Sequence, residues 1–259
     1  MQLFYKQYSN VGKPLIILHG MFGQQANWSG VAKAFSEKYA VYSFDARNHG
    51  QSPHASTMPY SKMAEDIAQT MDTIGLSKAD FIGHSMGGKI AMQFALNFPE
   101  RVNKLVVVDI APVNYESGPN QELSALQKIN LDSLSNRQQA DLVLQNNGVN
   151  NKAIRDFLLT NLKRNSEGKF EWRMNLSVIA KDYPLLKSWG EDTFRQSEFM
   201  GQTLFIKGEK SDYLLPKYTD QTLAFFPKAK VKVISEAGHW VHNENPEQFF
   251  KVVQKFLME

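Results

Sequence analysis

The sequence predicts an α/β fold in which a mostly parallel central sheet is flanked by helices. Short apolar runs rich in β-branched residues alternate along the chain with longer stretches whose composition favours helix. Several of these runs contain no polar position, which is typical of strands buried on both faces of a parallel sheet. Alternation of this kind indicates a sheet that is covered by helices on two sides.

Six segments of strand length define the expected sheet, and most of them are closely followed by polar residues or glycine. They are residues 15–18, 41–44, 80–82, 105–108, 203–206 and 231–234. Helices are expected over residues 60–74, 86–97, 218–225 and 246–257.

One long stretch, residues 115–199, interrupts the alternation between the fourth and fifth strands. It is polar and rich in Asn and Gln, and its apolar residues recur at helical spacing: Leu123, Leu126, Ile129, Ile154, Phe157, Leu158 and Leu162. We therefore expect a helical cap insertion that divides one α/β core into residues 1–114 and 200–259. Such an insertion emerges at one end of the sheet and covers whatever lies there.

The composition of the 259-residue chain is that of a globular protein, with 42% hydrophobic and 21% charged residues. It carries 29 basic and 26 acidic side chains without a run of like charges, so nucleic acid is not an expected partner. No secretion signal and no run of about 18 apolar residues is visible, so we expect a cytoplasmic protein without a membrane span. The absence of Cys excludes disulfides, thiolate metal sites and a cysteine nucleophile.

The segment Gly83-His84-Ser85-Met86-Gly87 runs from a predicted strand directly into a predicted helix. A nucleophile at such a sharp turn needs small residues two positions away on either side, because the strand and helix backbones approach closely there. The free N–H groups at the start of the following helix favour a developing oxyanion. The motif therefore indicates Ser85 as a catalytic nucleophile.

Together with this motif, three further segments resemble the α/β-hydrolase family over nearly the whole chain: His19-Gly20, residues 45–52, and Ala237-Gly238-His239. Residues 45–52 and 105–112 are similar, more narrowly, to the YbfF-like small bacterial esterases. The resemblance implies a serine esterase that acts on a small-molecule acyl ester or thioester and needs no cofactor and no metal.

A serine hydroxyl needs a general base, and His239 is the best candidate among the six histidines. It follows the last strand by a short loop, at the carboxyl edge where Ser85 lies, and the order serine before histidine fits this fold. We expect His84 to point away from the site, because successive strand residues face opposite sides of a sheet. His242 is expected to be structural or at the surface. For His49, His54 and Asp45, a solvated loop is favoured over a metal site, because no regular ligand spacing is present.

Two carboxylates compete for the third position of the triad. The usual acid of the family lies in a Gly-Glu-x-Asp turn after the strand before the last, but here Ser211 holds that position and the aspartate is displaced to Asp212. Asp109 ends the strand that we expect beside the Ser85 strand, within reach of a histidine that serves Ser85. Asp109 is therefore preferred, and Asp212 stays open as the alternative.

Family resemblance assigns the oxyanion hole to the backbone N–H groups of Met21 and Met86, with Phe22 as a neighbouring candidate whose ring can line the acyl pocket. Four aromatic and aliphatic residues of the insertion are candidates for an apolar lid: Phe157, Leu158, Trp172 and Trp189. A menaquinone-pathway-type lyase or a carbon–carbon bond hydrolase with the same triad is the alternative function. It requires a basic pocket, for which the sequence offers Arg47, Lys89, Arg155 and Arg173. A binding module that has lost activity is not favoured, because both Ser85 and His239 are present.

Overall fold

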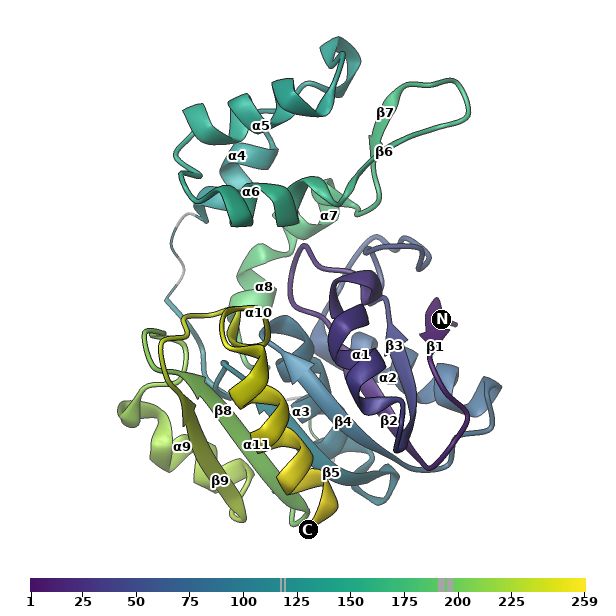
Figure 1. Cartoon of the computed structure of the whole chain (residues 1–259), viewed down its shortest axis with the longest axis vertical. Coiled ribbons are helices and arrows are strands. Elements are labelled where there is room, and N and C mark those ends of the chain that lie inside the picture. The colour runs from purple at the N-terminus through teal and green to yellow at the C-terminus, as the bar shows by residue number, and fades with distance from the viewer. Residues whose placement is uncertain (117, 119, 191–193, 195–197) are drawn as a thin grey trace.

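Seven strands form one sheet in the order β1-β3-β2-β4-β5-β8-β9 (Figure 1). Their bounds are Tyr5–Gln7, Lys13–Leu18, Tyr39–Phe44, Ala79–His84, Val102–Val108, Gln202–Gly208 and Ala229–Ile234, for β1, β2, β3, β4, β5, β8 and β9. The pairing of β1 with β3 is antiparallel and the other pairings are parallel. This computed structural model describes residues 1–116, 118, 120–190, 194 and 198–259. The predicted fold class and all six predicted strands are confirmed.

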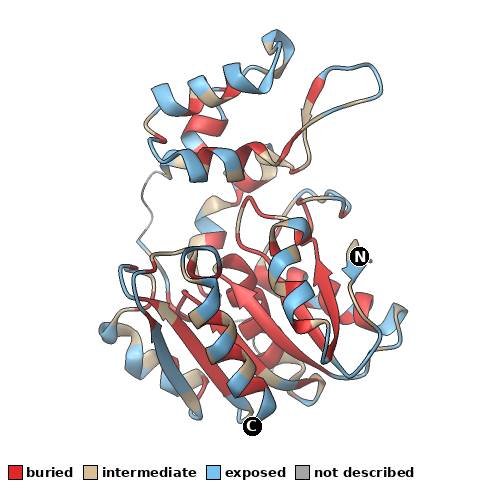
Figure 2. Cartoon of the chain, in the orientation of Figure 1, coloured by how far each residue is buried: buried red, intermediate tan, exposed pale blue. Residues whose placement is uncertain are grey.

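The apolar strands are buried because helices cover both faces of the sheet. Helices α1 (Ser29–Phe35) and α11 (Pro246–Met258) pack on one face, in a hydrophobic cluster that includes Leu15 and Ile17 of β2. Helices α2 (Tyr60–Thr73) and α3 (Met86–Asn97) cover the other face, in a second cluster that includes the alternate residues Ile16 and Leu18. Figure 2 shows the central strands buried and the edge strand β9 largely exposed.

Short helices complete the core. Two are α-helices, α9 (Thr219–Phe225) and α10 (Val241–Glu244). The 3₁₀ helices of the described residues include Gln25–Trp28, Pro99–Arg101, Leu131–Ser133 and Pro216–Tyr218. Of the predicted helices, the one over residues 218–225 begins as 3₁₀ and continues as α9. Within the described part of the chain, no helix has the length and hydropathy needed to cross a bilayer.

Residues 115–199, here called the insert, connect β5 to β8, and their described residues contain five α-helices besides the 3₁₀ helix Leu131–Ser133. These are α4 (Gln121–Leu126), α5 (Arg137–Asn146), α6 (Lys152–Leu159), α7 (Leu176–Lys181) and α8 (Tyr183–Lys187). Figure 1 shows α4 to α7 as a group that stands apart from the sheet, with α8 leading back to the core. Residues 117, 119, 191–193 and 195–197 of the predicted insertion lie outside the described residues.

The expectation of a purely helical insertion is wrong, because the insert also contains an antiparallel strand pair. Strands β6 (Leu162–Arg164) and β7 (Phe170–Trp172) pair with Leu162 opposite Trp172. Helix α6 ends at Leu159, so Leu162, which the sequence places at helical spacing, instead begins a strand. Gly168 has a φ of 80° in the connecting turn, a conformation that favours a hairpin over a continued helix.

The abundance of Asn in the insert has a structural cause. Asn120, Asn136, Asn151 and Asn175 precede α4, α5, α6 and α7, and each side chain accepts a hydrogen bond from a backbone N–H in the first turn of its helix. Such N-caps each contribute about 1 kcal/mol, because they satisfy donors that have no partner within the helix. The Asn residues that make the insert polar therefore cap the N-termini of its short helices.

Candidate active site

The nucleophile turn has the close packing that the sequence predicts. Strand β4 ends at His84 and α3 begins at Met86, and Ser85 between them has a φ of 52° and a ψ of −118°. A Cβ atom on Gly83 would lie 2.3 Å from the carbonyl oxygen of Gly87, and one on Gly87 would lie 2.4 Å from that of Leu18. Both positions therefore require glycine, and the strained backbone of Ser85 is typical of a functional residue.

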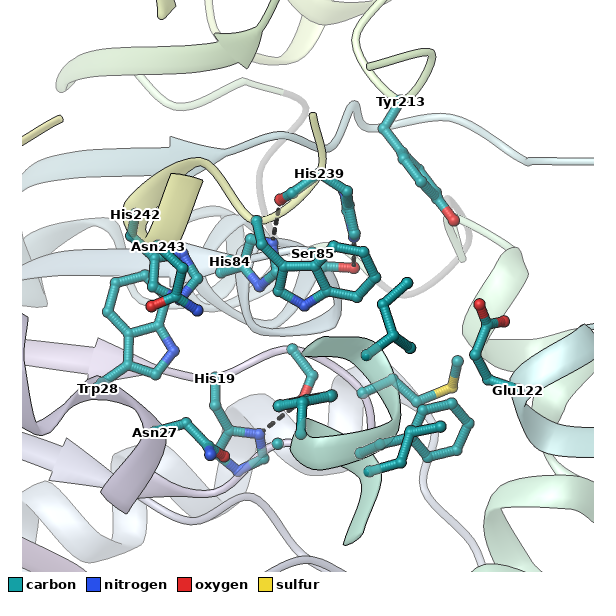
Figure 3. A pocket seen from close by; sticks show the side chains of 18 of the residues that line it. His19, Asn27, Trp28, His84, Ser85, Glu122, Tyr213, His239, His242 and Asn243 are labelled. Atoms are coloured by element: carbon teal, nitrogen blue, oxygen red, sulfur yellow. Dashed lines mark hydrogen bonds between the residues drawn. The ribbon is translucent and has the colours of Figure 1, made fainter. Parts of the chain in front are cut away.

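The structure brings Ser85, His239 and Asp109 into one chain of hydrogen bonds. The Nε2 atom of His239 lies 3.0 Å from the Ser85 Oγ (Figure 3), and its Nδ1 lies 2.8 Å from the Asp109 Oδ2. A carboxylate only accepts, so Nδ1 carries the proton and Nε2 accepts from the serine hydroxyl. This is the tautomer that a general base for Ser85 needs.

Asp109 is fully buried and accepts three hydrogen bonds. Besides His239, its donors are the backbone N–H of Gly208, at 3.0 Å, and the Ser211 hydroxyl. Ser211, at the position where the sequence pattern places the usual acid, thus donates a hydrogen bond to the Asp109 carboxylate. Asp212 is exposed, and it stands apart from the hydrogen-bond chain that joins Ser85, His239 and Asp109. The geometry favours Asp109 over Asp212.

The two amides assigned to the oxyanion hole flank Ser85. Met86 is the first residue of α3, and Met21 lies in a turn closed by a 3.0 Å hydrogen bond from the Gly23 N–H to the Gly20 carbonyl. Among the described residues, no acceptor is present for either N–H group. Met21, Ser85 and Met86 line one cavity, which the predicted oxyanion hole requires.

The loop that carries Met21 is held from two sides at the next residue. Phe22 has a φ of 62°, which is uncommon for a residue with a side chain. Its N–H donates to Nε2 of His49 at 3.3 Å, and its carbonyl accepts from the buried Asn161 side chain of the insert at 2.6 Å. The first contact holds the Met21–Phe22 peptide and the second holds the Phe22–Gly23 peptide, and neither was predicted from the sequence.

The prediction that His84 points away from the site is wrong. His84 is buried and lines the cavity at Ser85, beside the His239 loop. His84 Nε2 donates to the His239 carbonyl at 2.8 Å (Figure 3), and the two rings are 4.7 Å apart. Tyr213 stacks on the other side of the His239 ring, with centroids 4.1 Å apart. His239 is therefore held between an aromatic ring and a second histidine.

The expectation of a solvated loop around His49 is wrong, because His49 and Asp45 are buried. His49 Nδ1 donates to the Arg47 carbonyl at 3.0 Å, and His19 Nδ1 donates to the Gly20 carbonyl at 2.7 Å. Burial lowers the pKa of His19 to about 4 and that of His49 to about 3. Both rings therefore act as neutral supports of the oxyanion loop. Within the described residues, no group of three His, Cys, Asp or Glu side chains could hold a metal ion.

His242 is structural, which is one of the two expectations for it. It is buried and stacks on Trp28 with ring centroids 3.9 Å apart. Burial lowers its pKa to about 3.

A cavity of about 110 Å³ opens beside Ser85 and His239. Phe22 and two of the four predicted lid residues, Phe157 and Leu158, line it. The two predicted tryptophans do not: Trp172 lines a separate pocket beside His54, and Trp189 is fully buried against Phe225. Of the four predicted lid residues, the two on α6 therefore lie at the cavity beside Ser85, and their role as a lid stays a prediction.

The four basic residues that the sequence offers for binding an anionic substrate do not line one common pocket. Arg47 pairs with Asp66 at 2.6 Å, and Arg155 pairs with Asp141 at 2.8 Å. Lys89 lines a second cavity beside Ser85, whereas Arg47, Arg155 and Arg173 line neither of the two cavities at Ser85. The structure does not assemble the basic pocket that the alternative function requires.

Comparison with known proteins agrees with this geometry. A family model described as alpha/beta hydrolase fold matches residues 13–246. Esterase YbfF of Escherichia coli is 35% identical over 257 residues, which cover 99% of this chain and 96% of that protein. The sn-1-specific diacylglycerol lipase ABHD11 of Mus musculus is 35% identical over 250 residues, which cover 94% of this chain and 80% of that protein.

Among solved structures, a marine microorganism esterase matches with a TM-score of 0.95 and 37% identity, covering 99% of each chain. An E-2-(acetamidomethylene)succinate hydrolase has a TM-score of 0.78 at 21% identity, which shows a shared fold alone. The resemblance inferred from the sequence is confirmed. The chain belongs to the α/β-hydrolase family, in the branch that includes esterase YbfF.

Proposed function

We propose that this protein is a serine esterase that hydrolyses carboxylic esters or acyl thioesters through an acyl-enzyme on Ser85. The observation that carries the proposal is the continuous hydrogen-bond chain from Ser85 through His239 to the buried Asp109, at the edge of an apolar cavity. The esterase and lipase names of the relatives support the same reaction class.

In the first step the Ser85 Oγ attacks the substrate carbonyl carbon while His239 Nε2 takes the hydroxyl proton. The carbonyl oxygen becomes negatively charged, and the Met21 and Met86 amides stabilise it. Asp109 stays ionised and stabilises the imidazolium that forms on His239. His239 then gives its proton to the leaving oxygen or sulfur, and the acyl group stays on Ser85.

In the second step a water molecule replaces the leaving group beside His239. His239 takes a proton from that water, the resulting hydroxide attacks the acyl carbon, and the Ser85 oxygen leaves with the proton. The position of His239 Nε2, 3.0 Å from the Ser85 Oγ, allows it to serve as base and acid in both steps. These steps require only groups supplied by the chain and water.

The lyase or carbon–carbon hydrolase alternative is less well supported. It shares the triad, but it needs several cations around the substrate, and only Lys89 of the four candidates lines a cavity at Ser85. Lys89 donates to the carbonyls of Val113, Lys187 and Ser188 at 3.0, 3.0 and 2.7 Å, which uses all three of its hydrogens.

Replacing the nucleophile tests the proposed function. Ser85→Ala removes the attacking atom, so we expect turnover of a short-chain p-nitrophenyl ester to fall to the uncatalysed background while circular dichroism shows an intact fold. Retained turnover in a well-folded Ser85→Ala protein would contradict the proposal.

A further inference from the structure

Two cavities meet at Ser85, and they differ in size and in the catalytic groups that line them. The histidine-side cavity has a volume of about 110 Å³ and is lined by His239, Trp240 and the insert residues Phe157 and Leu158. The helix-side cavity has a volume of about 50 Å³ and is lined by Met86 and Lys89 of α3, Tyr60 of α2 and Leu186 of α8. Ser85, Met21, Asn120 and Tyr213 line both.

The directions of the four bonds of a tetrahedral intermediate assign one part of the substrate to each cavity. One bond joins the Ser85 Oγ, and the oxyanion faces the Met21 and Met86 amides. The leaving atom must face His239, because His239 protonates it. His239 lines the histidine-side cavity and not the helix-side cavity. The remaining substituent, the acyl chain, therefore points into the helix-side cavity.

Building on the proposed esterase function, we propose that the helix-side cavity binds the acyl chain and the histidine-side cavity binds the leaving group. The substrates are esters of a short acyl chain with a larger apolar alcohol or thiol. The helix-side cavity, at about 50 Å³, has less than half the volume of the histidine-side cavity, at about 110 Å³, so we expect the acyl chain to be the smaller of the two substrate parts.

Hydrogen bonds across the helix-side cavity hold its walls at this separation. The Tyr60 hydroxyl of α2 donates to the Leu186 carbonyl of α8 at 2.8 Å. Lys89 of α3 donates to the carbonyls of Lys187 and Ser188 at the end of α8. Helix α8 is therefore tied to both core helices beside Ser85, which limits how far this cavity can widen for a longer acyl chain.

Two leucines of the insert provide a matched pair of variants. Leu186 lines the helix-side cavity alone and is 7% exposed, whereas Leu158 lines the histidine-side cavity alone and is 1% exposed. Leu186→Ala and Leu158→Ala make the same chemical change in two buried positions. Each change removes the same atoms from a buried side chain, so we expect both variants to lose stability. A difference in substrate selectivity between the two variants therefore shows which part of the substrate each cavity binds.

The test measures ratios of kcat/KM within each variant, which do not depend on the amount of folded enzyme. The acyl series is p-nitrophenyl acetate, butanoate and octanoate, and the leaving-group series is methyl, hexyl and 1-naphthyl acetate. For the parent enzyme we expect kcat/KM to fall at least about 10-fold from butanoate to octanoate. Leu186→Ala should raise the octanoate-to-acetate ratio about 10-fold or more and leave the leaving-group ratios within about 2-fold.

Leu158→Ala should show the reverse pattern, with altered leaving-group ratios and an unchanged acyl-chain ratio. An octanoate gain in Leu158→Ala but not in Leu186→Ala would overturn the assignment, and so would unchanged ratios in both variants. These failures differ from failure of the proposed function, in which Ser85→Ala keeps its turnover or the parent hydrolyses none of these esters.

Discussion

At the scale of single residues, the backbone conformation of Asp109 and two hydrogen-bond donors hold its carboxylate in place. Asp109 has a φ of 52°, which turns its side chain from the end of β5 toward the His239 loop. The backbone of Gly208 and the hydroxyl of Ser211, both at the end of β8, donate to the carboxylate. A serine at the usual acid position is thus accounted for, because an acid there would place a second carboxylate against the buried Asp109.

Asp109→Asn is expected to lower kcat on the order of 10⁴-fold, because an amide group stabilises the wrong His239 tautomer and cannot compensate the imidazolium charge. Asp212→Asn is the matched control, since Asp212 is exposed, and its kcat should equal that of the parent. Steady-state kinetics with one p-nitrophenyl ester compares the two. A large loss of kcat in Asp212→Asn, together with unchanged kcat in Asp109→Asn, would show that Asp212 and not Asp109 is the acid of the triad.

At the scale of elements, the insert supports the oxyanion loop as well as covering the site. Asn161 lies between α6 and β6 and is fully buried. Its Nδ2 donates to the Phe22 carbonyl at 2.6 Å and to the Leu158 carbonyl at 3.2 Å. The backbone carbonyl of Asn161 accepts from the backbone N–H of Arg173, just after β7, at 2.7 Å. One residue therefore joins α6, the strand pair and the loop that carries Met21.

Asn161→Ala is expected to reduce kcat about 10-fold with little change in KM, because the Met21 amide loses its fixed position while the cavities remain. Asn175→Ala is the control: Asn175 also joins the insert to the core, through Asn48, but it does not contact the oxyanion loop. Both variants should lose about 1 kcal/mol of unfolding free energy. Equal kinetic effects in the two variants would show that Asn161 has only a structural role.

The sequence predicted the parts of the site that depend on local patterns. Gly83 and Gly87 indicate the nucleophile turn, because the strand and helix backbones that approach each other there are close in sequence. Asp109 and His239 could be identified as candidates because each follows a predicted strand. The Ser211–Asp109 and Asn161–Phe22 contacts were missed, because they join residues 102 and 139 positions apart and leave no periodic signal.

The insert was the least predictable element. The spacing of its apolar residues correctly indicated helices. The same spacing also predicted helix at Leu162, whereas α6 ends at Leu159 and Leu162 begins β6. Trp172 and Trp189 illustrate a second limit. Hydrophobicity predicts that a side chain is buried or packed, but whether it faces a cavity or another helix depends on tertiary contacts.

At the scale of the whole molecule, buried histidines make stability depend on pH. His19, His49, His84 and His242 are buried, and burial lowers the pKa of each below its ordinary value of 6.5, to about 4 for His19 and about 3 for His49 and His242. In the unfolded chain these rings bind protons below about pH 6.5, whereas in the folded protein they do not. Their contribution to stability is therefore complete above pH 6.5 and is lost as the pH falls toward the folded pKa values.

Acidification from pH 6.5 to 5 should thus lower the unfolding free energy by up to about 1.4 kcal/mol per pH unit for each buried histidine. Burial also raises the pKa of two carboxyl groups, that of Asp80 to about 6 and that of Asp45 above its ordinary value, and these two groups oppose the trend set by the four histidines. Urea unfolding at several pH values measures the slope. His242→Gln should reduce the slope, whereas His54→Gln, at an exposed position, should not; equal slopes in the parent and His242→Gln would refute this explanation.

The most direct test of the central claim, that Ser85 is the nucleophile of an acyl-enzyme, is covalent trapping followed by mass spectrometry. An aryl phosphonate ester should phosphonylate the parent protein once, with release of one equivalent of the phenol and with the added mass mapped to the peptide that contains Ser85. His239→Ala should react far more slowly, and Ser85→Ala should gain no mass. Stoichiometric labelling at another residue, or undiminished labelling of Ser85→Ala, would contradict the account.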